Sequence, residues 1–381
     1  MAFFNRLWTF FSGDTKQLHK QADVLKIGIL GAANICNMAL VNPASKLSNI
    51  LIYGIAARNR PKAEAFARKH HIPKVYDNYD ELLADPDITA IYNPLPNGLH
   101  YQWTMKALRS GKHVLCEKPL SNNASEAREM VEEARKQNRL LVEAFHYRYH
   151  PMCNETLRNL LSNKDRIGSI QNISAVFTVA ASFLKHDDIR FQYSLGGGTQ
   201  MDLGCYVVSS CRFIVNTYNN RNDDTEGPFE IQKAEALRVS PTNPQIDYGM
   251  RSDLILDGIK CNIYCEFTNN WSITKQQITI ECEHAIITVG YFIAPVFYHY
   301  ITVHDRRGNQ TRTIKNYGDN QSTYYYQLKA FVDAVKFAQN ESSMDRAYEI
   351  AYTTGKSGIR NMEIIDEIYR KAGLVVRGTE I

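Results

Sequence analysis

Short apolar stretches alternate with helical stretches from Leu25 onward, and this alternation constrains the fold more than any other feature. A repeated strand-helix-strand order implies a parallel sheet with helices on both faces. The apolar runs predict strands at residues 26–30, 51–56, 90–92, 113–116 and 140–144. The segments between and after them predict helices near residues 35–40, 61–70, 79–84, 100–110 and 124–138.

The pattern of apolar residues along the chain changes after Pro151. Alternation such as Ile263, Cys265 and Phe267 indicates strands with one buried face, and hence a largely antiparallel sheet. The expected strands are residues 170–181, 230–239, 251–256, 260–268, 276–282, 286–289 and 298–303. Helices are expected around residues 153–161, 323–338 and 346–372.

Composition indicates a soluble globular chain whose 381 residues suit two domains. The formal charge of +4 is modest, and no block rich in lysine or arginine suggests nucleic acid or anionic lipid as a partner. The eight cysteines contain no C-x-x-C pair and no secretory signal is recognised, so we expect reduced thiols and a cytoplasmic location.

An apolar face near the N-terminus is formed at helical spacing by Phe3, Phe4, Leu7, Trp8 and Phe11. We expect this face to pack against the protein's own domain or a partner subunit. A membrane-surface anchor and a mitochondrial presequence are the alternatives, although the segment is too short to span a bilayer.

The first predicted strand runs directly into Gly31-Ala32-Ala33-Asn34-Ile35-Cys36. This segment occupies the place of a G-x-G-x-x-G/A fingerprint, where the backbone approaches a pyrophosphate at a helix N-terminus. Only the first glycine is present. The place of the segment between a strand and a helix still predicts a dinucleotide site, formed by Gly31, Ala32, Ala33, Asn34 and Ile35.

The residues after the second strand indicate which dinucleotide binds. A carboxylate there would bind the ribose 2′-hydroxyl of NAD. The chain instead has Arg58, Asn59 and Arg60, and two guanidiniums suit a 2′-phosphate, so NADP is favoured over NAD. That the arginines are ordinary solvated loop residues is the alternative.

The loop at residues 93–100 leaves the sheet at the same edge. Two prolines stiffen it, and Asn97 is a natural helix cap. We expect Pro94, Leu95, Asn97 and His100 to contact the cofactor. A buried edge loop with structural prolines is the alternative.

The strand at residues 113–116 ends abruptly in Glu117, Lys118 and Pro119. Proline cannot continue a central strand, so the chain turns and leaves Lys118 at the carboxyl end of the strand, where ligands bind in open α/β sheets. A partly desolvated lysine held there can titrate or polarise a hydroxyl group. An ordinary surface Glu-Lys pair is the alternative, but the nucleotide-binding pattern favours a functional role, with Glu117 next to the cofactor.

A second candidate cluster follows three consecutive glycines at residues 196–198. Thr199 can cap the next helix, which places Asp202 and Tyr206 at i and i+4 on one helical face. A phenol next to a lysine ammonium has its ionised form favoured, so we expect Tyr206 to act as an acid or base near neutral pH. A capped structural helix with a core tyrosine is the alternative.

Together these motifs resemble the Gfo/Idh/MocA oxidoreductase family. The resemblance covers about residues 25–374 and also uses Tyr147-Arg148-Tyr149-His150-Pro151. Tyr206 stands where inositol dehydrogenases usually carry histidine. In this respect the chain is similar to glucose-fructose oxidoreductase, dimeric dihydrodiol dehydrogenase and the NADP-dependent xylose dehydrogenases.

The resemblance implies a fold of the α/β class: a Rossmann domain with a doubly wound parallel sheet, then an α/β domain with an open, mainly antiparallel sheet. It also implies a cis Lys118–Pro119 bond. We expect an N-terminal extension at residues 1–24, the Rossmann domain at 25–150 and a substrate-binding and dimerisation domain at 151–381.

The function implied by the resemblance is NADP-dependent hydride transfer to or from a hydroxyl carbon of a sugar or polyol, such as an aldose. Lys118, Tyr206 and Asp202 would be catalytic, and Arg148, His150 and Asp202 would bind the substrate, with no metal. A trans-dihydrodiol dehydrogenase and a non-catalytic NADP-binding regulator are the alternatives.

A homodimer through the C-terminal sheet is expected, because relatives pair through that face. The aromatic residues expected there are Phe267, Trp271, Tyr291, Phe292, Phe297, Tyr298 and Tyr300. Their burial inside one monomer is the alternative.

Overall fold

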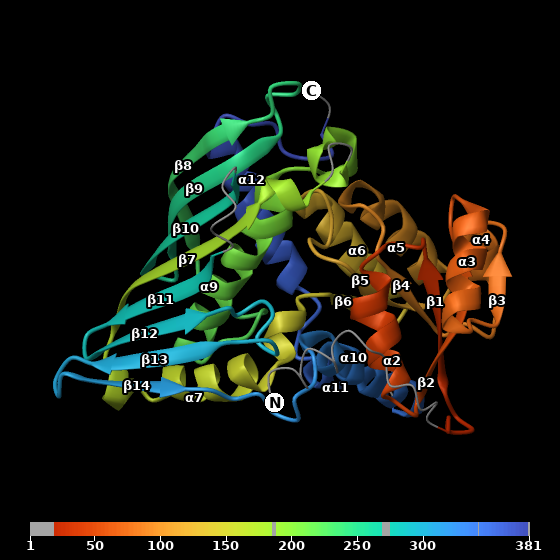
Figure 1. Ribbon diagram of the computed structural model, residues 1–381, viewed down its shortest axis with the longest axis horizontal. Coiled ribbons are helices and arrows are strands. Elements are labelled where there is room, and N and C mark those ends of the chain that lie inside the picture. Colours follow the sequence, from red (N-terminus) through yellow and green to blue (C-terminus); the bar gives the residue numbers. More distant parts are fainter. Residues whose placement is uncertain (1–18, 185–187, 269–274, 342, 380–381) are drawn as a thin grey trace.

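The computed structural model describes residues 19–184, 188–268, 275–341 and 343–379. The N-terminal apolar face and Trp271 lie outside these residues. The chain builds two sheets, with the larger one on the left of Figure 1 and the smaller one on the right. The expected α/β class, with one parallel and one mainly antiparallel sheet, is confirmed.

The first sheet has the strand order β3-β2-β1-β4-β5-β6 within the described residues, and all its neighbouring strands are parallel. The chain reverses its direction of winding between β1 and β4, which is where such sheets bind ligands at their carboxyl edge. The strands are β1 (Leu25–Leu30), β2 (Ile50–Ala56), β3 (Lys74–Tyr76), β4 (Ala90–Asn93), β5 (His113–Cys116) and β6 (Leu141–Glu143). The sequence did not predict β3, because three residues are too few to show an apolar period.

Apolar side chains of successive strand residues point to opposite faces of this sheet, and helices cover both. On one face lie α4 (Tyr79–Ala84), α5 (His100–Arg109) and α6 (Ala124–Lys136). On the other lie the π-helix η1 (Asn37–Val41), α2 (Asn42–Ser45), α3 (Arg60–His70), α10 (Thr323–Asn340) and α11 (Met344–Ile350). Helices α10 and α11 therefore return from the C-terminal part of the chain to cover the first sheet.

The second sheet has the order β14-β13-β12-β11-β7-β10-β9-β8 within the described residues. Strands β7 and β10 are parallel, and every other neighbouring pair is antiparallel. The strands are β7 (Ile170–Ala180), β8 (Phe229–Val239), β9 (Asp247–Leu256), β10 (Ile259–Thr268), β11 (Gln276–Cys282), β12 (Ala285–Gly290), β13 (Tyr300–Asp305) and β14 (Gln310–Ile314). The sequence did not predict β14, because its residues are polar and mostly exposed.

Helices α9 (Cys205–Tyr218) and α12 (Ser357–Lys371) cover the inner face of this sheet and lie between the two sheets (Figure 1). The π-helix η4 (Met152–Leu157), α7 (Arg158–Ser162) and α8 (Lys164–Ile167) follow the first sheet in the chain. The single helix expected at residues 346–372 is wrong. It is split into α11 and α12 by a bend in which Tyr352 and Gly355 have φ of 52° and 78°, a left-handed conformation that no helix interior accepts.

The aromatic residues expected at a dimer interface divide between two environments. Phe267 and Phe292 are buried in the core, so their assignment to the outer face is wrong. Tyr291 and Tyr298 are 43% and 44% exposed, and their rings lie close to that of Tyr300.

Candidate active site

The turn after β5 places Lys118 at the carboxyl edge of the first sheet. Lys118 and Pro119 are joined by a cis peptide bond, as the resemblance implied. The buried His100 ring lies between two loops of this edge, with Nδ1 2.8 Å from the Pro119 carbonyl oxygen and Nε2 2.7 Å from the Leu95 carbonyl oxygen. His100 therefore ties the loop after β4 to the turn that carries Lys118.

Lys118 reaches across to the π-helix η8 (Gln200–Gly204), which leads into α9. Its Nζ donates to the backbone oxygen and to Oδ1 of Asp202, both at 2.8 Å. The other carboxylate oxygen of Asp202, Oδ2, accepts a hydrogen bond from Arg190 Nε at 2.7 Å. Asp202 thus lies between two cations, and one of them was not predicted from the sequence.

This pairing sets the charge of the site. Burial alone would raise the pKa of Asp202, but Lys118 and Arg190 hold it well below its usual value. Burial alone would lower the pKa of Lys118, but the attraction of Asp202 outweighs it and the pKa is raised. At neutral pH Lys118 is therefore an ammonium that donates hydrogen bonds rather than a base that takes a proton.

Tyr206 lies one helical turn after Asp202, and Lys118 Nζ is 4.8 Å from the centroid of its ring. The Tyr206 hydroxyl oxygen is 3.0 Å from Nε2 of His146, a residue of the 3-10 helix η3 (His146–Tyr149). Burial raises the pKa of Tyr206 well above its ordinary value. The expectation that the nearby ammonium favours the ionised phenol is therefore wrong, because desolvation dominates.

Glu117 lies next to Lys118 in the same turn. Its Oε1 accepts a hydrogen bond from the buried Tyr92 hydroxyl at 2.7 Å, and burial raises its pKa. The carboxyl group therefore belongs to a buried network at the edge of the sheet.

The dinucleotide loop bends sharply at Gly31, where φ is +89°. A Cβ at this position would lie 3.1 Å from Leu95 Cδ2, in a backbone conformation that side chains rarely adopt. Ala32, Ala33 and Asn34 follow without regular structure, and Ile35 lines the cavity described below. The first glycine is therefore required by the turn, even though the rest of the fingerprint is incomplete.

The residues after β2 differ in how strongly the fold holds them. Asn59 caps α3, since its side chain accepts a hydrogen bond from the Lys62 backbone N–H at 3.0 Å. Arg60 pairs with Glu64 and Asp77 on the surface. Arg58 is exposed, so its guanidinium is the more available of the two for a ligand.

One cavity of about 330 Å³ brings these groups together between the first sheet and the inner face of the second. The sequence-predicted residues that line it are Ile35, Pro94, Leu95, Asn97, Glu117, Lys118, Asp202 and Tyr206. The glycine-rich turn forms one wall, and Asn97 Nδ2 donates to the Gly196 carbonyl oxygen at 3.0 Å. Apolar side chains form much of the rest: Phe177, Val179, Leu184, Ile189, Leu195, Leu203, Phe267 and Ile293.

Two predicted substrate residues do not line this cavity. Arg148 donates to Ser357 Oγ at 3.0 Å and pairs with Asp223 at 3.5 Å, outside the lining of the cavity. His150 is fully buried among aromatic rings of the core.

Two cavity-lining residues that sequence reasoning missed are His146 and Arg190. A sequence signal for His146 exists, because it is the third residue after β6 and therefore lies at the carboxyl edge of the sheet. Arg190 stands in the short 3-10 helix η6 (Ile189–Phe191) before the glycine-rich turn and gives no such signal.

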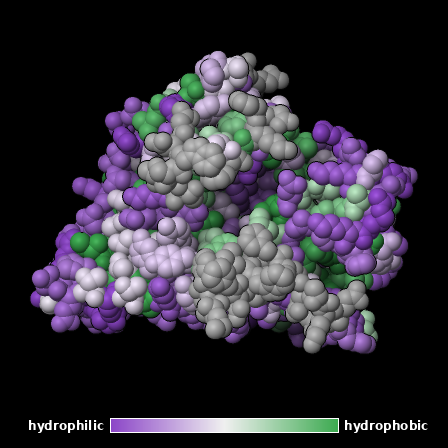
Figure 2. Space-filling model, viewed as in Figure 1, coloured by the Kyte–Doolittle hydropathy of each residue, from purple (hydrophilic) through white to green (hydrophobic). Residues whose placement is uncertain are grey.

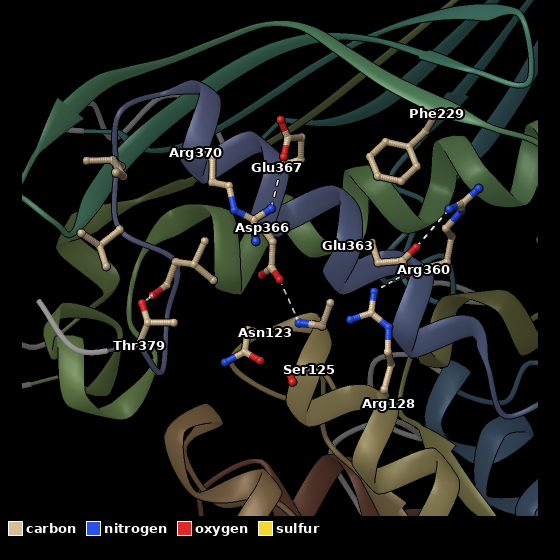
Figure 3. Close-up of a pocket in the computed structure, with 14 residues that line it drawn as sticks. Asn123, Ser125, Arg128, Phe229, Arg360, Glu363, Asp366, Glu367, Arg370 and Thr379 are labelled. Atoms are coloured by element: carbon tan, nitrogen blue, oxygen red, sulfur yellow. Dashed lines mark hydrogen bonds and ion pairs between the residues drawn. The ribbon is translucent and has the colours of Figure 1, made fainter.

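A second hollow of about 710 Å³ opens between α6, α12 and the C-terminal residues (Figure 3). Its arginines are already paired with carboxylates. Arg128 and Arg360 both reach Glu363, at 2.6 and 3.0 Å, and Arg370 reaches Glu367 at 3.1 Å. None of the acid/base residues described above lines this hollow, so we place the candidate site in the smaller cavity.

The parallel sheet with its glycine turn, next to a second sheet, defines the class of two-sheet dinucleotide-binding α/β proteins. Residues 25–145 match the model of the GFO_IDH_MocA family, described as an oxidoreductase family with an NAD-binding Rossmann fold. The resemblance seen in the motifs is therefore confirmed for these residues.

Among curated proteins, the chain is similar to D-xylose 1-dehydrogenase (NADP(+)) 2 of Haloferax volcanii. The two are 38% identical over 193 residues, which is 51% of this chain and 58% of the relative. It is also similar to trans-1,2-dihydrobenzene-1,2-diol dehydrogenase of Xenopus tropicalis, 38% identical over 202 residues, which is 52% of this chain and 58% of the relative. The aligned part thus spans little more than half the length of these relatives.

Among solved structures, the chain resembles KijD10, a 3-ketoreductase from Actinomadura kijaniata in complex with NADP and TDP-benzene. The TM-score is 0.77 at 22% identity, covering 91% of this chain and 98% of the other. An aldose-aldose oxidoreductase from Caulobacter crescentus, complexed with glycerol, gives a TM-score of 0.77 at 18% identity, covering 92% and 98%. These likenesses confirm that the two-sheet fold extends over nearly the whole chain.

Proposed function

We propose that the protein is an NADP-dependent oxidoreductase that transfers a hydride between a CH–OH carbon of a sugar or polyol and a nicotinamide. The observation that carries the proposal is the meeting of Lys118, Asp202 and Tyr206 at the carboxyl edge of the first sheet, near the Gly31 loop. Support comes from the similarity to a xylose dehydrogenase whose name includes NADP.

The residues at this edge fit NADP. The turn at Gly31 keeps the backbone free of a side chain where a pyrophosphate would approach, and we assign Gly31 to Ile35 to that group. We assign Arg58 to the 2′-phosphate, with Asn59 and Arg60 next to it, since no carboxylate follows β2. Pro94, Leu95, Asn97 and Glu117 line the cavity and would face the nicotinamide end. When bound, the nicotinamide supplies the hydride donor or acceptor.

Lys118 and Tyr206 have different roles in the reaction. Lys118, kept charged by Asp202, donates a hydrogen bond to the substrate oxygen and stabilises negative charge that develops there. Tyr206 holds its proton at neutral pH, so it can give that proton to the substrate oxygen during reduction of a carbonyl. Oxidation runs through the same groups in reverse.

One observation supports a second candidate substrate. Many of the side chains that line the cavity are apolar and cannot hydrogen-bond the hydroxyl groups of an aldose. It suits a substrate with an apolar ring, such as a trans-dihydrodiol, the substrate in the name of a relative. A non-catalytic NADP-binding regulator is the remaining alternative, but such a protein has no need of a charged lysine next to a buried phenol.

The test is to incubate the purified protein with NADP or NAD and a panel of aldoses, polyols and trans-dihydrodiols, and to measure absorbance of the reduced nicotinamide. We expect turnover with NADP that is lost in Lys118→Met and in Tyr206→Phe. Tight binding of NADP with no turnover on any compound would favour the regulator instead. Full turnover by either variant would show that the assigned roles are wrong.

We also propose a homodimer through the second sheet. Its support is the cluster of the exposed Tyr291 and Tyr298 with the half-buried Tyr300, since symmetric pairing through one patch is the commonest form of association. We expect Tyr298→Arg to weaken a dimer seen by sedimentation equilibrium. A single species near 43.5 kDa for the unmodified protein at micromolar concentration would contradict the proposal.

We propose a cytoplasmic location, supported by the eight cysteines, which are all buried and unpaired. No helix in the described part of the chain is long and apolar enough to cross a membrane. Figure 2 shows that the described residues on the viewed face are mostly hydrophilic, with only scattered hydrophobic side chains.

We propose two domains, at residues 25–150 and 151–381, with residues 1–24 as an N-terminal extension. The different patterns of the two sheets support this division, and α10 and α11 of the second domain pack on the sheet of the first.

A further inference from the structure

His146 connects the candidate acid, Tyr206, to the first turn of α10. Its Nε2 lies 3.0 Å from the Tyr206 hydroxyl oxygen, and its Nδ1 lies 2.7 Å from Thr323 Oγ1. The ring also packs on Tyr324, with centroids 4.0 Å apart, so its orientation is fixed on several sides. Thr323 of α10 thus holds the His146 ring, which in turn contacts the Tyr206 hydroxyl group.

The imidazole of His146 is neutral in this position. It is buried and close to the Lys118 ammonium, and burial first, then Lys118, lowers its pKa to about 3. A neutral imidazole carries one N–H, so one of its nitrogens donates and the other accepts. The hydroxyl groups of Tyr206 and Thr323 can each do either, which leaves two possible arrangements.

The two arrangements have different consequences for Tyr206. If His146 accepts at Nε2, the phenolic proton points at the imidazole and is not available to a substrate. If His146 donates from Nε2, the phenolic proton is free to point into the cavity. The same N–H then stabilises the phenolate that remains after proton transfer, because a hydrogen bond to the charged form favours ionisation.

We propose that His146 is a positioning residue, protonated at Nε2, that donates to the Tyr206 oxygen while Thr323 donates to its Nδ1. In this arrangement His146 directs the Tyr206 proton to the substrate oxygen and supports the phenolate, without gaining or losing a proton itself. This assignment rests on the proposed function for the role of Tyr206. The position of the proton on the ring can be measured without any substrate.

The first arm of the test is NMR of the full-length protein labelled with ¹⁵N-histidine, recorded from pH 5 to 8. His146→Gln identifies the His146 signals. We expect a neutral ring throughout, with a proton on Nε2 and none on Nδ1. A proton on Nδ1 alone, or a ring that titrates in this range, would overturn the proposal even if no substrate were known.

The second arm uses kinetics with NADPH and the best carbonyl substrate from the panel. His146→Phe should lower kcat roughly 100-fold with a much smaller change in KM, because the lost donor acts mainly on the transition state. His146→Gln keeps an N–H donor of similar reach and should recover most of the rate. His304→Phe is the matched control, since His304 lies on β13, away from the cavity.

The pH profile distinguishes positioning from a merely structural role. Loss of the His146 N–H should move the apparent pKa assigned to Tyr206 upward in His146→Phe but not in His304→Phe. The other ionisable groups near this pair, which are unchanged in both variants, are Lys118, Glu117, Asp202, Cys205 and Tyr324. An unchanged kcat and pH profile in a folded His146→Phe would overturn the proposal. Absence of turnover in the unmodified protein would instead contradict the proposed function and leave the NMR result to decide.

Discussion

Replacing Asp202 with asparagine tests the charge pairing of the candidate site by a route that needs no substrate. The substitution keeps the shape of the side chain but removes the negative charge between Lys118 and Arg190. Two cations then face each other in a poorly solvated place. The folded state should become less stable, and burial should then lower the pKa of Lys118 instead of being outweighed.

The size of the effect follows from the burial of the pair. Removing one member of a buried ion pair costs about 3–5 kcal/mol of unfolding free energy. Because the Lys118 and Asp202 side chains are still 14% and 17% exposed, we expect the lower end, about 3 kcal/mol. At roughly 2 °C per kcal/mol for a large domain, Asp202→Asn should lower the melting temperature by about 6 °C.

The pH dependence of this effect has a definite sign. The folded pKa of Asp202 is below its unfolded value of about 3.9, so the carboxylate stabilises the protein above that pH. The stabilisation is lost as the pH falls through the folded pKa. The difference in stability between the two proteins should therefore be constant from about pH 5 to 8 and shrink below about pH 4.

Thermal unfolding measured by calorimetry provides the assay. Asp333→Asn is a matched control, because Lys329 and Asp333 are 2.6 Å apart, close to the 2.8 Å between Lys118 and Asp202, but are 52% and 37% exposed, and such surface pairs contribute little. An Asp202→Asn variant that melts within about 1 °C of the unmodified protein would refute the reasoning.

Three further predictions concern other parts of the molecule. Arg58→Ala should weaken NADP binding at least tenfold while leaving NAD binding unchanged, whereas Arg60→Ala should weaken NADP binding less. Titration calorimetry measures the affinity of each variant for both dinucleotides. Equal losses of NADP affinity in the two variants would contradict the assignment of Arg58 to the 2′-phosphate. Burial raises the pKa of Glu143 to about 7, so its ionisation destabilises the protein by about 3 kcal/mol as the pH rises from about 4.5 to 7. The stability of Glu143→Gln, measured by chemical unfolding, should not decline over this pH range. If the stability of both proteins falls in parallel as the pH rises, ionisation of Glu143 is not the cause. Arg377→Met should cost about 3–5 kcal/mol, because it leaves the buried carboxylate of Asp247 unpaired. Adding Asp247→Asn should recover part of that loss, and two additive losses would show that the pair is not coupled.

Much of the first sheet was predictable because its signals are local. A central parallel strand is apolar along its whole length, and asparagine, a residue type that favours helix starts, caps α3 and α6. Short or exposed strands such as β3 and β14 lack this signal. The bend between α11 and α12 was missed because its left-handed residues, Tyr352 and Gly355, do not interrupt the apolar period around them.

The candidate site was predictable only in part. Lys118 and Asp202 stand out in the sequence because each lies next to a turn that proline or glycine dictates, and the structure brings their side chains within 2.8 Å. Arg148 and His150 also stand out, but they face the core and its ion pairs, since the direction of a side chain in an irregular segment depends on the packing around it.

The sequence by itself determined the alternation of strands and helices in the first part of the chain, the turn at Gly31 and the residue types that can exchange a proton, because each depends on neighbours a few positions away. Only the tertiary structure decided which of these groups meet, how they are charged and what holds them. Burial keeps the proton on Tyr206, and Asp202 keeps the charge on Lys118. His146 meets Thr323 only because α10, about 180 residues further along the chain, returns to cover the first sheet.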